Sequence, residues 1–350
     1  MGVLPGGGFS FGHMLAVLAL IFHGMSYLYS HGTGSILGPF PVHGQHEMDS
    51  LLISELPPPH YVHPIAFQVY CVIGVLISCA TCALYAHELV LSDWGIIAGA
   101  LYNMNMQLTI QASSWVGIST GCGVASASAI VSSAIIGRLL FEDAVLSGQM
   151  SFMALCLMVL GILGVCFSRE MAFSLCQAGV HSPLSLVPWP TNPHFANASK
   201  AGKTLGLICG VLGGAFGGAM MAPQRLSGLS IFEFLPSFGL GAAFCSLSML
   251  GSFYLAAPTW MRPEWSTDDL VGGTFTGIVW NTSLVFVLLA IDRVGYAFAF
   301  ATFHCFAVVV MFWNHFLWNG NSPKVRFVYG GSAILVITGI ATLALAAPGR

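Results

Sequence analysis

Ten stretches of about 20 mostly apolar residues follow one another along this chain, and their length limits what it can fold into. About 20 such residues in a helix cross the hydrocarbon core of a bilayer. Helix is the expected conformation, because backbone groups in lipid must pair within their own segment and no alternating barrel pattern appears. The sequence predicts an all-α membrane protein with ten transmembrane helices, at approximately residues 9–30, 65–86, 94–114, 117–141, 150–168, 204–222, 236–257, 270–290, 293–318 and 327–347.

The scarcity of charged residues points the same way. Only 7% of the residues are charged and 56% are hydrophobic, whereas soluble domains carry about 25% charged residues. This composition excludes soluble enzymes and disordered chains, and the net charge of −3 leaves no basic face for nucleic acid. The ten cysteines lie in apolar segments, where we expect small buried hydrophobes rather than a disulfide framework.

Two loops are longer than a hairpin connection. One is rich in His and Pro and covers residues 31–64, and the other is rich in Pro and covers residues 169–203. The second loop leaves five spans on each side. We therefore expect a first five-helix unit at 1–168, an inter-unit loop at 169–203 and a second five-helix unit at 204–350.

The two units are related by an internal repeat. An offset of 178 residues aligns three successive spans without a gap, matching Gly95, Gly99, Asn103 and Gly117 with Gly273, Gly277, Asn281 and Gly295. Because each unit has an odd number of spans, the second would enter the bilayer upside down relative to the first. Two inverted repeats are a recurrent transporter architecture, with the substrate site near the midplane between the halves. A duplicated membrane scaffold without transport is the alternative.

Polar side chains within the spans indicate where a solute could bind. The third span carries Asn103, Gln107 and Gln111 at four-residue spacing, so they share one helix face. We expect these amides to line a cavity, with hydrogen bonds between helices as an equally good explanation, whereas Asn105 and Ser283 are expected to pack on another face. With the neighbouring rings, the candidate contacts for a neutral, hydroxyl-rich solute are Asn103, Gln107, Gln111, Tyr102, Tyr27, Trp280 and Asn281.

Titratable residues near or within the spans suggest further roles. His23 and His304 could act as a protonation switch, with a neutral, hydrogen-bonded histidine as the alternative for each. Arg138 and Arg225 are the candidate contacts for an anionic substrate. Clear mid-span carboxylates, which a carrier of polycations would need, are missing.

No motif predicts an enzyme, a cofactor or a metal site. Residues 117–121 match the G-x-S-x-G nucleophile elbow, but that motif needs a strand-to-helix turn and here it joins two membrane helices. Cys79 and Cys82 form a C-x-x-C inside an apolar helix, without the second pair that a zinc site needs.

Two segments resemble sequences of the drug/metabolite transporter superfamily, namely GRLLFED at 137–143 and GLICGVLGGAFGGAMMAPQR at 206–225. The second is similar to the opening helix of a half in the glucose/ribose porter group. This resemblance implies ten helices from two five-helix units, a carbohydrate or similar polar metabolite as substrate, and both termini in the cytosol.

We therefore expect a secondary transporter that moves a small neutral polar metabolite, first of all a sugar, by alternating access. An organic-anion or nucleotide-sugar exchanger is the alternative within transport, and a non-transporting scaffold or receptor is the alternative from another class. The expected partners are the lipid bilayer, the substrate and, in a homodimer, a second copy of the chain. A plasma membrane and an internal membrane both fit.

Overall fold

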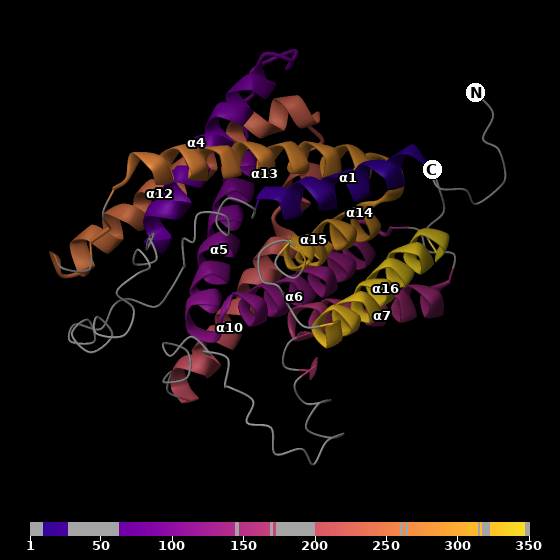
Figure 1. The fold of residues 1–350 in the computed structure, drawn as a ribbon. Helices are drawn as coiled ribbons and strands as arrows, with labels where there is room; N and C mark the ends of the chain where they lie inside the picture. The colour runs from indigo at the N-terminus through magenta and orange to yellow at the C-terminus, as the bar shows by residue number, and fades with distance from the viewer. Residues whose placement is uncertain are drawn as a thin grey trace, which may run out of the picture.

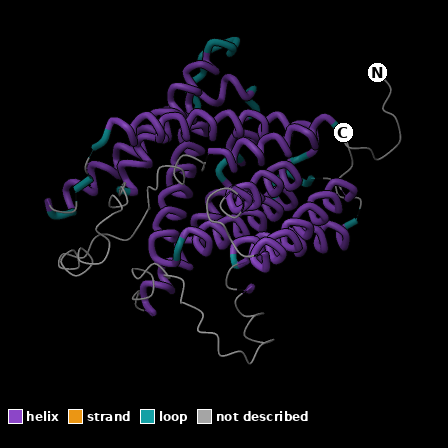
Figure 2. The backbone as a smooth tube through the Cα atoms, viewed as in Figure 1, coloured by secondary structure: helices purple, strands orange, loops and turns teal. Residues whose placement is uncertain are grey.

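The computed structural model describes residues 10–26, 63–143, 147–168, 171–172, 200–259, 262–263, 265–313, 316 and 323–346. Throughout these ranges the regular secondary structure is helical (Figures 1 and 2). The elements are α1 Phe11–Ser26, α4 Pro64–Ala83, α5 Asp93–Val116, α6 Ile118–Leu139, α7 Gly148–Cys166, α10 Lys200–Ala219, α11 Ala222–Ser227, α12 Ile231–Ala256, α13 Thr267–Val294, α14 Tyr296–Phe303, the 3₁₀ helix η2 His304–Phe306, α15 Ala307–Trp313 and α16 Pro323–Ala346.

Eight helical segments of the described part are long and apolar enough to cross a membrane, as expected of a multi-pass membrane protein. The helix α1 is equally apolar but, at 16 residues, shorter than these eight. The helix α5 differs, because its 24 residues are long enough to span but its amides and hydroxyls keep it outside the eight. Its neighbours α4, α6, α10 and α12 surround it in the middle of the bundle (Figure 1), which shields its polar side chains from lipid.

Helix starts are set by side chains that satisfy the first backbone N–H groups. His63 caps α4 and is followed by Pro64, whose missing N–H costs nothing at this position. Ser147 and Ser266 cap α7 and α13, and Ser230 forms a capping box at the start of α12.

The ninth expected span, at 293–318, is interrupted. The helix α14 ends at Phe303, the 3₁₀ turn η2 follows, and α15 resumes at Ala307. A 3₁₀ stretch inside a helix often marks a functional site. Here the interruption includes His304, one of the two histidines singled out from the sequence.

Close helix contacts depend on glycine. Gly99 lets α5 approach α12, because a Cβ at this position would overlap the carbonyl oxygen of Phe238. Gly277 lets α13 approach α4 in the same way, against the carbonyl oxygen of Cys71. Figure 1 also shows α1 beside α13 and α7 beside α16. Small residues at such contacts allow dense packing, which is the main source of helix association in lipid.

The cysteines of the described part are free, as expected, but only some of them are buried. The nine that are described are free thiols, and those that are fully buried are Cys71, Cys79, Cys122, Cys166 and Cys305.

Candidate functional site

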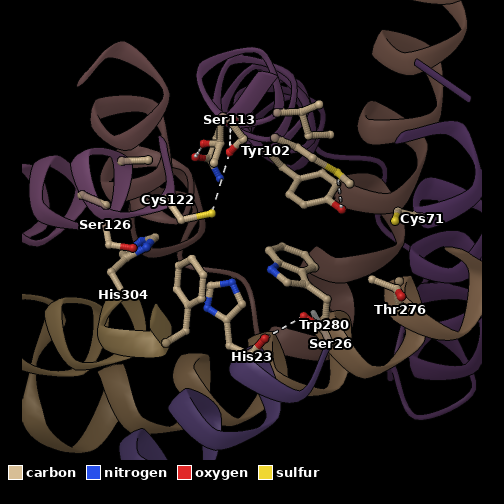
Figure 3. Close-up of a pocket in the computed structure, with 18 of the residues that line it drawn as sticks. His23, Ser26, Cys71, Tyr102, Ser113, Cys122, Ser126, Thr276, Trp280 and His304 are labelled. Carbon is tan, nitrogen blue, oxygen red and sulfur yellow. Dashed lines mark hydrogen bonds between the residues drawn. The ribbon is translucent and has the colours of Figure 1, made fainter. Parts of the chain in front are cut away.

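A cavity lies between α1, α4, α5, α6, α13 and η2 (Figure 3). It contains about 1010 Å³ of space, counted with the part that is open to the surroundings. Residues from both halves of the chain line it: His23, Ser26, Phe67, Cys71, Tyr102, Asn105, Met106, Thr109, Ile110, Ser113, Cys122, Ala125, Ser126, Ala129, Thr276, Gly277, Trp280, His304 and Phe306.

None of these lining residues is Asp, Glu, Lys or Arg. The polar groups of the wall are hydroxyls, imidazoles, one amide and thiols, all of which can be uncharged. Burying a charged solute here would leave its charge without a partner, which is costly in a medium of low dielectric constant. The lining therefore favours a neutral ligand.

Tyr102 and Trp280 form an aromatic wall, and both are almost fully buried. Their ring centroids are 4.2 Å apart, and Phe238 lies behind Trp280 with its ring nearly parallel at 6.3 Å. The hydroxyl of Tyr102 donates to the sulfur of Met106 at 3.4 Å. These two residues were candidates from the sequence, and the structure brings them together on the cavity.

The two candidate histidines also meet here. Their ring centroids are 6.3 Å apart. His23 is sandwiched between Phe303 and Phe306, at 4.1 and 4.0 Å, and its Nδ1 lies 3.3 Å from the carbonyl oxygen of Phe303. A carbonyl only accepts, so Nδ1 of His23 carries the hydrogen. His304 packs edge-on against Phe303.

The structure differs from expectation for the four candidate carboxamides, Asn103, Gln107, Gln111 and Asn281, which do not line the cavity. Asn103 is fully buried, donates to the carbonyl oxygen of Ala242 in α12 and accepts from Gln68 in α4. Asn281 donates to Ser78 Oγ in α4 at 2.8 Å. Both therefore hold neighbouring helices together, which was the alternative explanation.

The remaining amide candidates lie on the same side of α5 as Asn103. Gln107 is buried and Gln111 is half-buried, and neither lines the cavity. Tyr27 lies outside the described residues. The face predicted from four-residue spacing is thus real, but it is turned away from the cavity.

Of the candidate arginines, Arg138 lies in the last turn of α6 and Arg225 in α11, and neither lines the cavity. Arg225 is paired with the carboxylate of Asp143, with 2.8 Å between Nη1 and Oδ1, and its guanidinium covers the ring of Phe141 at 4.7 Å. Arg138 is exposed and donates to the backbone carbonyl of Asp143 at 3.1 Å. Neither guanidinium is placed to contact a solute in the cavity.

The sequence also contains a second polar row on α5, and this row marks the face that meets the cavity. Asn105, Thr109 and Ser113 also follow one another at four-residue spacing on α5, and all three line the cavity. Asn105 was expected to pack. Ser126 and Thr276 are isolated polar residues in apolar helices, and no spacing distinguishes them from hydroxyls that only bond to their own helix.

Within the described ranges, no group of three or more His, Cys, Asp and Glu side chains is placed to hold a metal ion. Compared with known proteins, the chain matches no protein-family model and no curated protein.

Proposed function

We propose that this chain is a secondary transporter that carries a small neutral polar metabolite, first of all a sugar, across a membrane by alternating access. The observation that carries the proposal is the uncharged cavity with polar and aromatic walls, enclosed by helices of both halves of a membrane bundle. A neutral solute can exchange water for the wall's hydroxyls and ring faces there without leaving a charge unpaired.

Equivalent packing of the two halves supports an internal repeat. Gly99 of α5 packs on α12, and Gly277, its counterpart at the 178-residue offset, packs on α4. Gly117 and Gly295 are also counterparts, and each joins two helices with nearly the same backbone angles, φ 89 and ψ 152 against φ 88 and ψ 162. This agreement fits the drug/metabolite transporter architecture that the sequence resembles.

Contacts at the helix ends support opposite orientations of the two units. Gly12, at the start of α1, packs on Arg293 at the end of α13. Asp143, which follows α6, accepts a hydrogen bond from the backbone N–H of Ala297 at the start of α14, directly after the end of α13. The end of α6 therefore lies on the same side of the bundle as the start of α1 and the end of α13. Gly206, near the start of α10, packs on Trp115 at the end of α5, from which α6 runs back toward Asp143. The first helices of the two units would thus enter the bilayer from opposite sides.

One end of the bundle is held closed. Asp143, from the first unit, accepts hydrogen bonds from Arg225 and from the backbone N–H of Ala297, both of the second unit and both at 2.8 Å. Tyr296 beside them donates to the carbonyl oxygen of Gly218 at 2.8 Å. The cavity lies farther along the helices, near the C-terminal end of α1 at His23. Such a one-sided arrangement fits one state of an alternating-access cycle.

The two rival functions are less consistent with these contacts. An organic-anion or nucleotide-sugar exchanger needs a cationic group in the cavity, and Arg225 is already paired with Asp143. A scaffold does not need an uncharged cavity enclosed by both halves of the chain, and a receptor, which would bind a ligand there without moving it, differs from a transporter in uptake.

Uptake of labelled hexoses and pentoses into proteoliposomes tests the proposal. Wild type should take up at least one of them, Trp280→Ala should lose most of that uptake, and Trp265→Ala, an exposed tryptophan outside the cavity lining, should retain it. Countertransport of nucleotides lost in Arg225→Ala would favour the exchanger. Absence of any uptake, with cysteine accessibility that no solute changes, would favour the scaffold.

A further inference from the structure

Three side-chain atoms on the cavity wall have no hydrogen-bond partner, namely Ser126 Oγ, Thr276 Oγ1 and His304 Nε2. They belong to α6, α13 and η2, and the three residues are 1%, 8% and 3% exposed. Buried polar atoms without a partner are rare, because each loses its bonds to water and gains nothing in exchange. Three such atoms around one cavity point to a ligand that supplies the missing partners.

The role of His304 is fixed by its other nitrogen. The ring interacts with the backbone carbonyl of Gly217, and because Nε2 has no partner, Nδ1 is the nitrogen that faces this carbonyl. A carbonyl only accepts, so Nδ1 carries the hydrogen. No carboxylate lines the cavity to balance an imidazolium, so the ring is neutral and Nε2 is a hydrogen-bond acceptor. A ligand must therefore bring an O–H or N–H group to it.

The two hydroxyls differ from others in the same and neighbouring helices. Ser113 and Ser133 donate to carbonyl oxygens of their own helices, at 2.9 and 2.6 Å, as hydroxyls in membrane helices commonly do. Ser126 and Thr276 make no such bond. A free hydroxyl can both donate and accept, which matches a hydroxyl on the ligand.

The arrangement of these groups limits the shape of the ligand. Figure 3 shows Ser126 and His304 together on one side of the cavity, Thr276 on the other side, and Trp280 between them. A ligand that reaches both sides needs hydrogen-bonding groups on opposite edges and an apolar face in the middle, against the indole.

We propose that Ser126, Thr276 and His304 are the polar contacts of the transported solute, an uncharged molecule that donates to His304 Nε2 and exchanges hydrogen bonds with the two hydroxyls. This assignment rests on the proposed function. Rings that carry hydroxyls around an apolar face have this chemistry, and so do neutral cyclic amides with N–H groups on opposite edges.

Stability without ligand tests the assignment first. Removing an unpartnered buried polar atom removes a cost, so Ser126→Ala and Thr276→Val should leave the melting temperature of the detergent-purified protein unchanged or raise it. Ser133→Ala, which removes a partnered buried hydroxyl, should lower it. A fall for Ser126→Ala and Thr276→Val as large as that for Ser133→Ala would overturn the assignment, because the two hydroxyls would then be partnered.

Binding tests it second, with pentoses, hexoses, uracil and N-methylated uracil as probes and with gluconate and glucosamine as charged controls. Ser126→Ala, Thr276→Val and His304→Leu should each weaken binding of the best neutral probe by about threefold to tenfold, the worth of one hydrogen bond. Thr282→Val, on α13 but outside the cavity lining and bonded to the carbonyl oxygen of Ile278, should change it less than twofold. A preference for hexoses identifies a polyol and a preference for uracil over its methylated form identifies a cyclic amide.

The outcomes separate this assignment from the proposed function. Uptake of a neutral probe that all three variants bind as well as wild type would overturn the assignment and leave the transport proposal standing. Binding of the charged controls alone would overturn both, and so would binding of no probe combined with no uptake.

Discussion

Replacing Asn103 with leucine distinguishes a structural amide from a ligand-binding one. In wild type the Asn103 side chain joins three helices, donating to Ala242 of α12 and accepting from Gln68 of α4. Leucine has the same number of side-chain heavy atoms with the same branching, but no polar atom. Two interhelical bonds are lost, at about 0.6 kcal/mol each in membrane proteins. The Nε2 of Gln68 also loses its best acceptor in a fully buried position, which costs about 1 to 3 kcal/mol.

The lower part of that range applies, because Gln68 keeps weaker contacts with the Asn103 carbonyl at 3.5 Å and the Met249 sulfur at 3.8 Å. We expect Asn103→Leu to lower the free energy of unfolding in mixed micelles by about 2 kcal/mol. Replacing Gln68 with leucine as well should recover about half of this, since removing both partners leaves no orphaned donor. Unchanged stability of Asn103→Leu together with a large loss of solute affinity would refute the reasoning and return the amide to the binding site.

Three further predictions concern packing, the closed end and pH. Gly74→Ala and Gly277→Ala each drive a Cβ into a facing carbonyl oxygen, so each should lower the free energy of unfolding by about 1 to 3 kcal/mol. Gly330→Ala, with open space around it, should leave the free energy of unfolding unchanged or raise it by about 0.5 kcal/mol in the same assay. Arg225→Gln should increase labelling of the cavity thiol Cys122 by an impermeant maleimide added on the Asp143 side, as measured by peptide mass spectrometry. Arg138→Gln, which makes the same charge change, should not increase it. Equal labelling in both variants would contradict a closing role for the ion pair. Burial lowers the pKa of His63, the cap of α4, from 6.5 to about 4. Between these pH values the unfolded chain takes up a proton at His63 that the folded chain does not, so stability should fall as the pH drops from 6.5 to about 4. Thermal melts should show a smaller fall in His63→Asn.

The sequence was sufficient for the membrane class, because a run of 20 apolar residues has few alternatives to a spanning helix. Tyr102 and Trp280, which were chosen because they flank the amides, do line the cavity, but their role as solute contacts stays a prediction. The described cysteines are free, as expected, but only five of the nine are buried and Cys156 is exposed.

The orientation of α5 could not be obtained in this way. Two polar rows run along this helix, one with Asn103 and the other with Asn105, Thr109 and Ser113. Which row meets the cavity depends on how α4, α10 and α12 pack around α5, and the spacing within one helix contains no information about its neighbours. The break at His304 was missed for a related reason, because the surrounding sequence is uniformly apolar and has no proline or glycine to signal it.

Gly117 and Gly295 each form the entire connection between two helices, α5 with α6 and α13 with α14. A single residue has only two rotatable backbone bonds, so a tilt of one helix is passed to the next with little slack. Each pair of helices is therefore expected to move together and to bend only at its glycine. The helix α5 lines the cavity, and the helix α6 ends near the Asp143 ion pair. A tilt of α5 is therefore transmitted to α6 through the backbone. Inserting a few flexible residues at Gly117 or Gly295 would uncouple movement in the middle of the bundle from movement at its closed end.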